Sequence, residues 1–209
     1  TNSGNITPEV PFEKFDKMRA SLNVLGPLLT HYGSARINWP GGDDFGGRPI
    51  NLHVAGLQKM GATVEEGLYD IFAVADRLKG TNIELDIPSV GATENLLTAA
   101  IFARGVTVID NAAREPEVQD LCNMLIAMGA DIEGAGTNRI VVHGVDRLAG
   151  IHYDVLPDRI EAGTFLVAGA MTGGRVVARK TRADIMDAVL VKLEEAGAHL
   201  DVTDDSITV

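Results

Sequence analysis

Basic residues are scarce in this sequence: 18 Lys and Arg stand against 29 Asp and Glu, which gives a formal net charge of −11 at pH 7. Affinity for nucleic acid comes mainly from Lys and Arg side chains that neutralise phosphates. The charge balance therefore argues against a general nucleic-acid-binding protein. A small anionic ligand would need a local group of arginines instead.

Cysteine, long apolar runs and an export signal are missing or nearly so. Cys122 is the single cysteine, which excludes an internal disulfide and fits a reducing compartment. No apolar run approaches the roughly eighteen residues of a membrane span, and the first residues lack the pattern of a signal peptide. We therefore expect a cytoplasmic protein that does not bind membranes. Its 209 residues, 45% of them hydrophobic, suffice for one or two domains with a buried core.

What the sequence does contain is an internal repeat. Three segments share one order, in which a helix end is followed by Gly-Ala, a strand, a turn and a second strand: 57–80, 125–150 and 193–209. Upstream of the last two lie 93–110 and 160–180, which both read as a helix that ends near a glycine and leads into a strand. The sequence thus predicts three copies of a module of about two helices and four strands.

The apolar pattern predicts where the helices of the module lie. Within 115–129, Pro116 suits the first turn and Gly129 suits the C-terminal cap. Apolar residues recur there at helical spacing, namely Val118, Leu121, Cys122, Leu125 and Met128. We therefore expect Cys122 to be an inert core residue. The segment 165–171 is apolar on every side, which predicts a helix that is buried all round. This pattern favours a fold with its helices inside and its sheets outside.

Two loops combine glycines with groups that could bind or react. The loop "WPGGDDFGGRP" holds two adjacent carboxylates, Asp43 and Asp44, which could also simply solubilise an exposed loop. The segment "SVGATENLL", residues 89–97, places a glycine at the entrance to a helix, where backbone N–H groups can bind an anionic oxygen. A simple turn with Thr93 as the N-cap explains the same sequence equally well.

Two arginines lie close to these features. Arg19 precedes the apolar stretch "ASLNVLGPLL", and Arg48 ends the glycine-rich loop. A guanidinium group suits bidentate contact with phosphate or carboxylate, although either arginine could equally be an ordinary surface residue.

Six longer motifs together resemble a known family. They are "MRASLNVLGPL", "PGGDDFGGRPINLH", "PSVGATENLL", "NAAREPEVQDL", "GVDRLAG" and "LPDRIEAGTFLVAGAM". In this order they resemble the UDP-N-acetylglucosamine 1-carboxyvinyltransferases, enolpyruvyl transferases that open bacterial peptidoglycan synthesis. The resemblance runs through essentially the whole chain. The related enolpyruvyl transferases that act on shikimate 3-phosphate share the fold.

The resemblance implies an α/β fold of the enolpyruvyl transferase type. This is an inside-out α/β barrel with buried helices, in which two domains of three repeats each hold the substrates in the cleft between them. Residues 1–155 are similar to the second and third repeats of the catalytic-loop domain. Residues 156–209 are similar to the first repeat of the other domain, which would be incomplete. We therefore expect this chain to associate with the missing repeats or with another copy of itself.

The resemblance also implies a reaction. Family members transfer the enolpyruvyl group of phosphoenolpyruvate to the 3'-hydroxyl of UDP-N-acetylglucosamine and release phosphate, with no metal or organic cofactor. The alternatives are transfer to 3-phosphoshikimate, or a paralogue or fragment that binds a nucleotide sugar without turning it over. The family's Lys-Asn pair that contacts phosphoenolpyruvate and its later Asp base have no match here. We therefore expect the chain alone to be inactive.

Asp43 stands where this family carries its proton donor, which is usually a cysteine. An aspartate is ordinarily ionised at neutral pH, so it can act as an acid only where its surroundings favour the neutral form. Asp44, the substrate phosphate and the exclusion of water by a closed loop would all do so. Fosfomycin alkylates the loop cysteine of the family, a reaction that needs a thiolate and that a carboxylate performs far more weakly.

The remaining matches imply a substrate site. Arg19 and Arg48 match arginines that line the site for phosphoenolpyruvate and the nucleotide sugar. The segment that holds uridine matches Arg48, Pro49, Ile50, Asn51 and Leu52, with His53 continuing it, and the backbone contacts to the diphosphate match Ser89, Val90 and Gly91. Two departures are Ile87, where some members have a lysine, and Asn23, where some have tryptophan.

Overall fold

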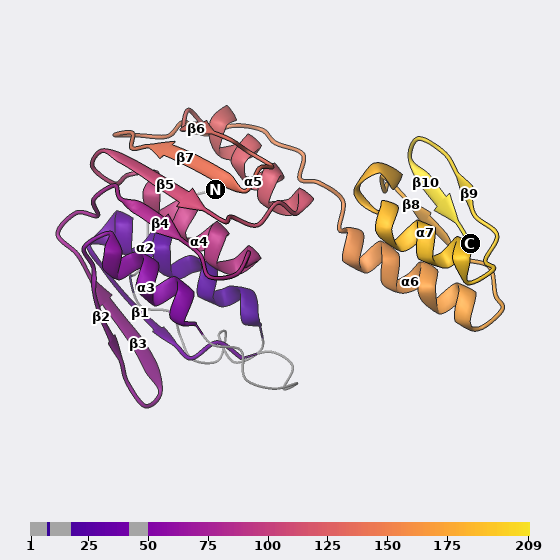
Figure 1. Ribbon diagram of the computed structural model, residues 1–209, viewed down its shortest axis with the longest axis horizontal. Helices are drawn as coiled ribbons and strands as arrows, with labels where there is room; N and C mark the ends of the chain where they lie inside the picture. Colours follow the sequence, from indigo (N-terminus) through magenta and orange to yellow (C-terminus); the bar gives the residue numbers. More distant parts are fainter. Residues whose placement is uncertain (1–7, 9–17, 42–49) are drawn as a thin grey trace. The chain divides into compact units, whose positions relative to one another are not determined.

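The computed structural model describes residue 8 and residues 18–41 and 50–209. The chain forms two compact units, Thr1–Tyr153 and Asp154–Val209 (Figure 1). Both units are mixed α/β. The assignment of residues 1–155 and 156–209 to particular repeats of a larger fold stays a prediction.

The first unit contains two groups of elements. The first group consists of η1 (Arg19–Val24), α2 (Leu25–Tyr32), β1 (Ser34–Asn38), α3 (Asn51–Lys59), β2 (Thr63–Glu66) and β3 (Asp70–Val74). The second group consists of β4 (Asn82–Glu84), α4 (Val90–Ala100), β5 (Val106–Asp110), α5 (Pro116–Ala127), β6 (Asp131–Glu133) and β7 (Arg139–His143).

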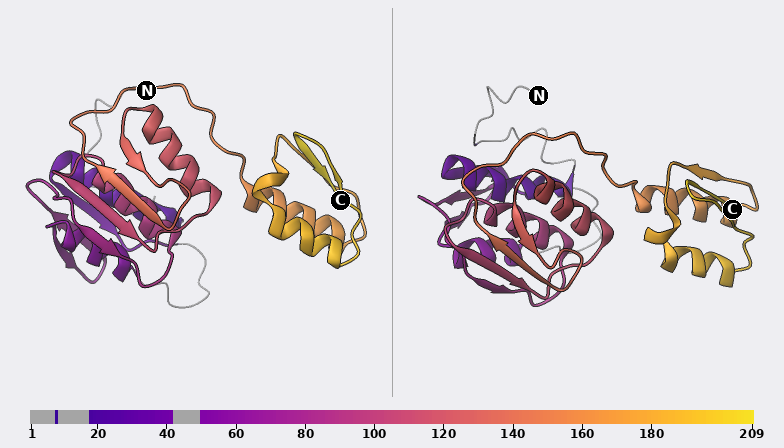
Figure 2. Two further views of the ribbon diagram at one scale, coloured as in Figure 1. Left: turned by 45° about the horizontal axis from the view of Figure 1, so that its top comes forward. Right: turned by 90° about the horizontal axis from the view of Figure 1, so that it is seen from above.

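The second unit contains one such group. Its elements are α6 (Arg159–Met171), β8 (Val177–Arg179), η2 (Ala183–Ile185), α7 (Asp187–Glu195), β9 (Asp201–Val202) and β10 (Ser206–Thr208). In Figure 2, α6 and α7 lie next to each other with these strands beside them.

The three groups repeat one topology. Each contains a helix, a strand, a second helix and two further strands, and the last strand lies in the middle of its sheet. The sheet orders are β1-β3-β2, β4-β5-β7-β6 and β8-β10-β9. The predicted three-fold repeat is therefore present, with three strands rather than four in the common module. The fourth strand of the second sheet, β4, pairs in parallel with β5 and lies outside the repeated topology.

A glycine at an equivalent position ends the second helix of each module. Gly61, Gly129 and Gly197 follow α3, α5 and α7 with φ angles of 93°, 102° and 90°. These values lie in the left-handed region that non-glycine residues rarely adopt, and a glycine there closes the helix. The repeated Gly-Ala steps of the sequence are thus helix stops.

The helices of the first unit form its core. Helix α2 packs on β1 and β3, α4 packs on β5 and β7, and the two helices pack on each other (Figure 1). Leu25, Leu29, Leu96 and Leu97 are fully buried in this contact region. Cys122 is also buried, as expected, and burial raises the pKa of its thiol to about 11.

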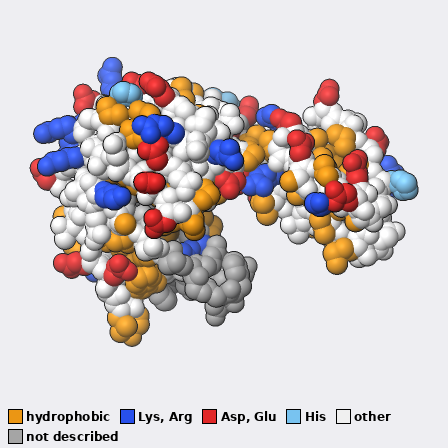
Figure 3. Space-filling view, viewed as in Figure 1, with side chains coloured by type: hydrophobic (Ala, Val, Ile, Leu, Met, Phe, Trp, Pro, Cys, Tyr) orange, Lys and Arg blue, Asp and Glu red, His pale blue; other side chains and the backbone are white. Residues whose placement is uncertain are grey.

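The second unit has a small core and an uncovered helix face. Its buried apolar residues are Leu166, Met186, Leu190, Leu193 and Ile207. On α6, however, Phe165 is 57% and Met171 is 81% exposed, so the prediction of a helix buried all round is wrong within this unit, although Leu166 is buried. The physical reason is that one module packs elements against only one side of its first helix. Apolar side chains are visible on the surface of this unit in Figure 3.

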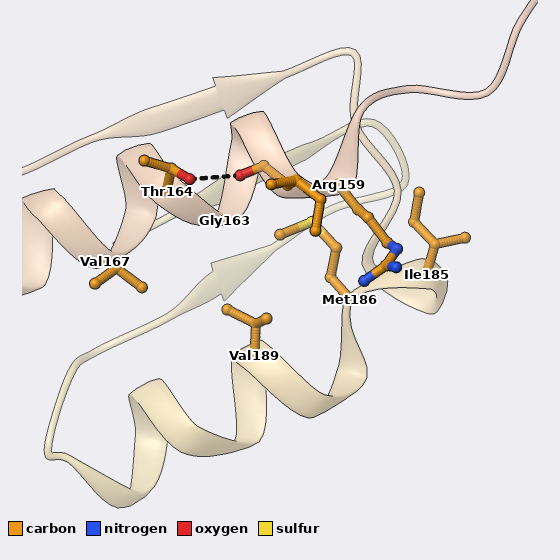
Figure 4. Close-up of a pocket in the computed structure, with 8 residues that line it drawn as sticks. Arg159, Gly163, Thr164, Val167, Ile185, Met186 and Val189 are labelled. Atoms are coloured by element: carbon orange, nitrogen blue, oxygen red, sulfur yellow. Dashed lines mark hydrogen bonds between the residues drawn. The ribbon is translucent and has the colours of Figure 1, made fainter. Parts of the chain in front are cut away.

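A hollow of about 350 Å³ separates part of α6 from α7 and the segment before it. It is lined by Arg159, Ile160, Gly163, Thr164, Val167, Ile185, Met186 and Val189 (Figure 4). The Thr164 hydroxyl does not reach across this space, since it donates a hydrogen bond of 2.7 Å back to the Ile160 carbonyl. The two helices of this module are therefore incompletely packed.

No helix within residues 18–41 and 50–209 is both long and apolar enough to cross a membrane.

We expect the uncovered face of α6 to drive association of the chain with a second copy. Replacing both Phe165 and Met171 with Glu should shift the chain toward monomer in sedimentation velocity, because exposed apolar side chains favour burial in a contact. The unfolding free energy should change by no more than about 0.5 kcal/mol per exposed site. Val202→Glu, an exposed apolar position on β9, is the matched control. A wild-type chain that is monomeric at all concentrations would contradict this expectation.

Candidate functional site

A group of polar side chains gathers at the start of α4. They come from three elements that are separate in the sequence: η1, α3 and α4. The members are Arg19 and Asn23 from η1, His53 from α3, and Ser89, Gly91, Glu94 and Asn95 from α4 or its cap. We refer to these residues as the α4 cluster. The cluster is well placed to bind a ligand, because the first amides of a helix lack intrahelical acceptors.

Helix α4 begins at a defined cap. Ser89 has an extended backbone, and its hydroxyl accepts a hydrogen bond of 3.3 Å from the Ala92 amide. The Thr93 amide donates to the Ser89 carbonyl at 2.9 Å. Ser89, and not Thr93, is therefore the N-cap. The amides of Val90 and Gly91 have no acceptor within the helix, so they are available to a ligand or to water.

His53 is fixed by a buried chain of hydrogen bonds. The Gly26 amide donates to Asn95 Oδ1 at 2.7 Å, and Asn95 Nδ2 lies 3.0 Å from His53 Nδ1. His53 is 6% exposed and Asn95 is fully buried. Burial lowers the pKa of His53 to about 4, and the charge of Arg19 acts in the same direction. His53 is therefore a neutral imidazole at neutral pH.

Asn23 and Glu94 form a second pair. Asn23 Nδ2 donates a hydrogen bond of 2.5 Å to Glu94 Oε2. Burial raises the pKa of Glu94, the bond from Asn23 opposes that rise, and the charges of Glu117 and Glu115 add to it. The pair thus links η1 to α4 through a carboxylate that is half-buried.

Gly91 leaves a space between His53 and Asn23. A Cβ atom added at Gly91 would lie 3.5 Å from His53 Cε1, 3.6 Å from His53 Nε2 and 3.6 Å from Asn23 Oδ1. These are ordinary van der Waals distances, so the space would accept an atom without displacing its neighbours. A ligand atom near that position would contact both side chains and lie above the start of α4.

The structure brings some of the predicted site residues together. His53 and Gly91 are neighbours, and Arg19 lies close enough to His53 for its charge to influence the imidazole. Asn51 begins α3 on an exposed turn. The side chains of Ile50 and Leu52 instead pack into or against the apolar core. Ile50 is buried and can offer only its backbone to a ligand, whereas the side chain of Leu52 is partly exposed.

Part of the predicted site lies outside the described residues. This part comprises Asp43, Asp44, Arg48 and Pro49. Their roles as proton donor, neighbouring carboxylate and substrate contacts stay predictions, as do the roles of Ser89 and Val90.

Sequence reasoning missed Asn95 and Glu94. The signal for Asn95 was a polar residue directly before the apolar stretch "LLTAA" of a buried helix, because a buried amide must find hydrogen-bond partners. Glu94 carries no comparable signal, since its partner Asn23 is distant in the sequence.

No group of three or more His, Cys, Asp or Glu within the described ranges is arranged to hold a metal ion. The polar groups of the α4 cluster are amides, a hydroxyl, an imidazole, a guanidinium and one carboxylate. Such a set suits hydrogen bonding to an organic ligand.

The chain matches the EPSP synthase (3-phosphoshikimate 1-carboxyvinyltransferase) family over residues 2–209. Among solved structures it is similar to the enolpyruvyl transferase NikO from Streptomyces tendae, with a TM-score of 0.79, 23% identity, and coverage of 97% of this chain and 49% of that one. It is also similar to an EPSP synthase from Acinetobacter baumannii, with a TM-score of 0.63, 24% identity, and coverage of 91% and 45%. At these identities the likeness to solved structures concerns the fold alone. The chain spans about half the length of these proteins.

The neutral state of His53 predicts how stability depends on pH. The pKa of His53 is about 4 in the folded chain, below the ordinary value of 6.5, so the unfolded chain binds more protons between these two values. Stability should therefore be complete above about pH 6.5 and should fall as the pH drops toward about 4, by at most about 3 kcal/mol from this group. Urea unfolding followed by the fluorescence of Trp39, the single tryptophan, measures this in the first unit.

His53→Gln removes the titrating group and should flatten that part of the pH dependence. His152→Gln, at an exposed histidine of the same unit, is the control and should leave the dependence as in the wild type. Equal pH dependence in the wild type and His53→Gln would show that His53 is not buried in its neutral form.

Proposed function

The chain belongs to the EPSP synthase (3-phosphoshikimate 1-carboxyvinyltransferase) family, which supports enolpyruvyl transfer. We propose that it is part of an enzyme that transfers the enolpyruvyl group of phosphoenolpyruvate to the 3'-hydroxyl of UDP-N-acetylglucosamine. Its place would then be at the start of peptidoglycan synthesis, in cell-wall formation. Enolpyruvyl transfer as a class follows from the family. The acceptor is the proposed part, and it rests on the six motifs described above.

One observation carries the choice of acceptor. The resemblance assigns the segments 48–53 and 89–91 to the nucleotide sugar, and these segments are far apart in the sequence. In the structure, His53 at the start of α3 lies beside Gly91 at the start of α4, and both face the same space. Two segments expected to contact one ligand are therefore close enough to do so.

The first amides of α4 and the charge of Arg19 suit an anionic substrate. The start of α4 carries the positive end of the helix dipole, and its first two amides are available as donors. Arg19 adds a full positive charge close to His53. Phosphate and carboxylate groups, which both substrates carry in this proposal, are stabilised by such groups.

The chemistry requires an acid and a base. An acid adds a proton to the methylene carbon of phosphoenolpyruvate, which leaves oxocarbenium character at C2, and a base removes the proton of the attacking hydroxyl. Loss of the proton from the methyl group and departure of phosphate then restore the double bond. We assign the first proton to Asp43, as its position in the glycine-rich loop implies. The base would come from a part of the protein beyond this chain.

Transfer to 3-phosphoshikimate is the second candidate. It is favoured by the family that the chain matches and by its likeness to an EPSP synthase from Acinetobacter baumannii. The third candidate is a paralogue or fragment that binds the nucleotide sugar without turnover. Ligand binding separates the first two, and phosphate release by the full-length protein separates the first from the third.

Gly91→Ala tests the proposed site. The added methyl group would meet only contacts of 3.5 Å or more, and alanine favours a helix over glycine by up to about 1 kcal/mol. The variant should therefore be at least as stable as the wild type, whereas its affinity for UDP-N-acetylglucosamine should fall about tenfold or more, because the methyl group occupies the ligand space. Isothermal titration calorimetry and urea unfolding measure the two quantities.

Gly150→Ala is the control, since nothing lies within 4 Å of a Cβ at that position and Gly150 is not part of the α4 cluster. Shikimate 3-phosphate serves as the competing ligand. Tight binding of that ligand together with no binding of the nucleotide sugar would favour the second candidate over the first.

Asp43 is tested in the full-length enzyme with fosfomycin. The wild type should be insensitive, because a carboxylate is a far weaker nucleophile toward the drug than a thiolate. Asp43→Cys should remain active and gain sensitivity. Asp43→Ala should lose at least about a hundredfold in kcat, the usual contribution of a general acid, with substrate affinity largely kept. Normal turnover by Asp43→Ala would mean that Asp43 only solubilises its loop.

A further inference from the structure

The amide of Asn95 can be oriented in only one way. The Gly26 backbone amide can only donate, so the Asn95 atom that it contacts at 2.7 Å must be the oxygen. The other end of the Asn95 side chain, its NH2 group, therefore faces His53 Nδ1 at 3.0 Å. An NH2 group donates, so Nδ1 accepts, and a neutral imidazole then carries its hydrogen on Nε2.

The amide of Asn23 is oriented in the same manner. Its NH2 group donates to the carboxylate of Glu94 at 2.5 Å, which leaves the Oδ1 atom as an acceptor. This Oδ1 and His53 Nε2 are each 3.6 Å from the position that a Cβ would take on Gly91. The space above Gly91 is therefore flanked by one N–H donor and one carbonyl acceptor.

The donor in this space has no partner of its own. His53 is more than nine-tenths buried, and its Nε2 atom makes no hydrogen bond with any residue that the structure describes. Nε2 is not among the buried side-chain atoms that lack a partner in the described part of the chain, so a ligand or water can reach it and accept its hydrogen bond. The position lies at the start of an eleven-residue helix whose first amides are also available.

We propose that Asn95 is a positioning residue that holds His53 with its hydrogen on Nε2, and that this N–H and Asn23 Oδ1 together recognise a hydroxyl group of the substrate. This inference rests on the proposed function for the identity of the substrate. A hydroxyl group accepts one hydrogen bond and donates another, which matches the two partners. An ionised phosphate oxygen would satisfy His53 but would face the carbonyl oxygen of Asn23, which repels it.

Nuclear magnetic resonance of the 209-residue chain with 15N-labelled histidine tests the role of Asn95 without any ligand. His53 signals are identified as those that disappear in His53→Gln. The wild-type chain at neutral pH should show a pyridine-like Nδ1 and a pyrrole-like Nε2. In Asn95→Asp the carboxylate still accepts from the Gly26 amide but can no longer donate to His53, so a hydrogen should move onto Nδ1. A wild-type Nδ1 that already carries hydrogen, or an Asn95→Asp spectrum like that of the wild type, would overturn the assignment.

Calorimetric titration with UDP-N-acetylglucosamine tests the hydroxyl. His53→Gln places an amide N–H near the position of Nε2 and should bind within about threefold of the wild type, whereas His53→Leu should lose about tenfold, the usual effect of one hydrogen bond. Asn23→Ala removes the acceptor and should also weaken binding about tenfold. Unchanged or tighter binding by Asn23→Ala would assign the space to a phosphate oxygen and reject the hydroxyl.

The two experiments test different claims, so one can fail while the other succeeds. A wild-type chain that bound no UDP-N-acetylglucosamine would reject the proposed function and the hydroxyl that rests on it. The spectrum of His53 would still decide whether Asn95 sets the tautomer.

Discussion

The first unit depends on one constraint, the burial of a polar side chain inside a helix contact. Asn95 lies on the fully buried face of α4, where an unpaired amide would cost several kcal/mol. It is satisfied by the Gly26 amide on one side and by His53 on the other. Because Gly26 belongs to α2 and His53 to α3, these bonds fix three helices relative to one another. The same contacts decide which way the imidazole of His53 presents its hydrogen.

Close helix packing makes these bonds geometrically possible. A Cβ on Gly26 would lie 2.6 Å from Asn95 Oδ1, and a Cβ on Gly56 would lie 2.5 Å from Leu96 Cδ1. A larger residue at Gly26 would meet the backbone of α4 and push α2 away, and one at Gly56 would displace the buried side chain of Leu96. Two glycines within helices therefore serve the contact with α4, although glycine is a weak helix former. The second unit has a comparable contact at only one side of α6, which explains its exposed Phe165 and Met171.

Local sequence patterns predicted much of the fold. The three-fold repeat, the helix stop at Gly129 and the burial of Cys122 all followed from spacing and caps, because these depend on residues close together in the chain. Two features did not follow. The parallel pairing of β4 with β5 joins strands separated by a helix, and the one-sided burial of α6 depends on which elements pack beside it. Neither is encoded in a short window of sequence.

The sequence by itself determined the modules and the membership in the enolpyruvyl transferases, and it supplied candidate substrate-binding residues that stay predictions. It did so because periodicity, turn residues and motifs are properties of neighbouring letters. Only the tertiary structure brought His53 to Gly91 and placed Asn95 and Asn23 around them. It also set the direction of their hydrogen bonds, since the orientation of an amide is fixed by a partner that can only donate or only accept. Those partners lie on other helices, so no local sequence pattern could predict them.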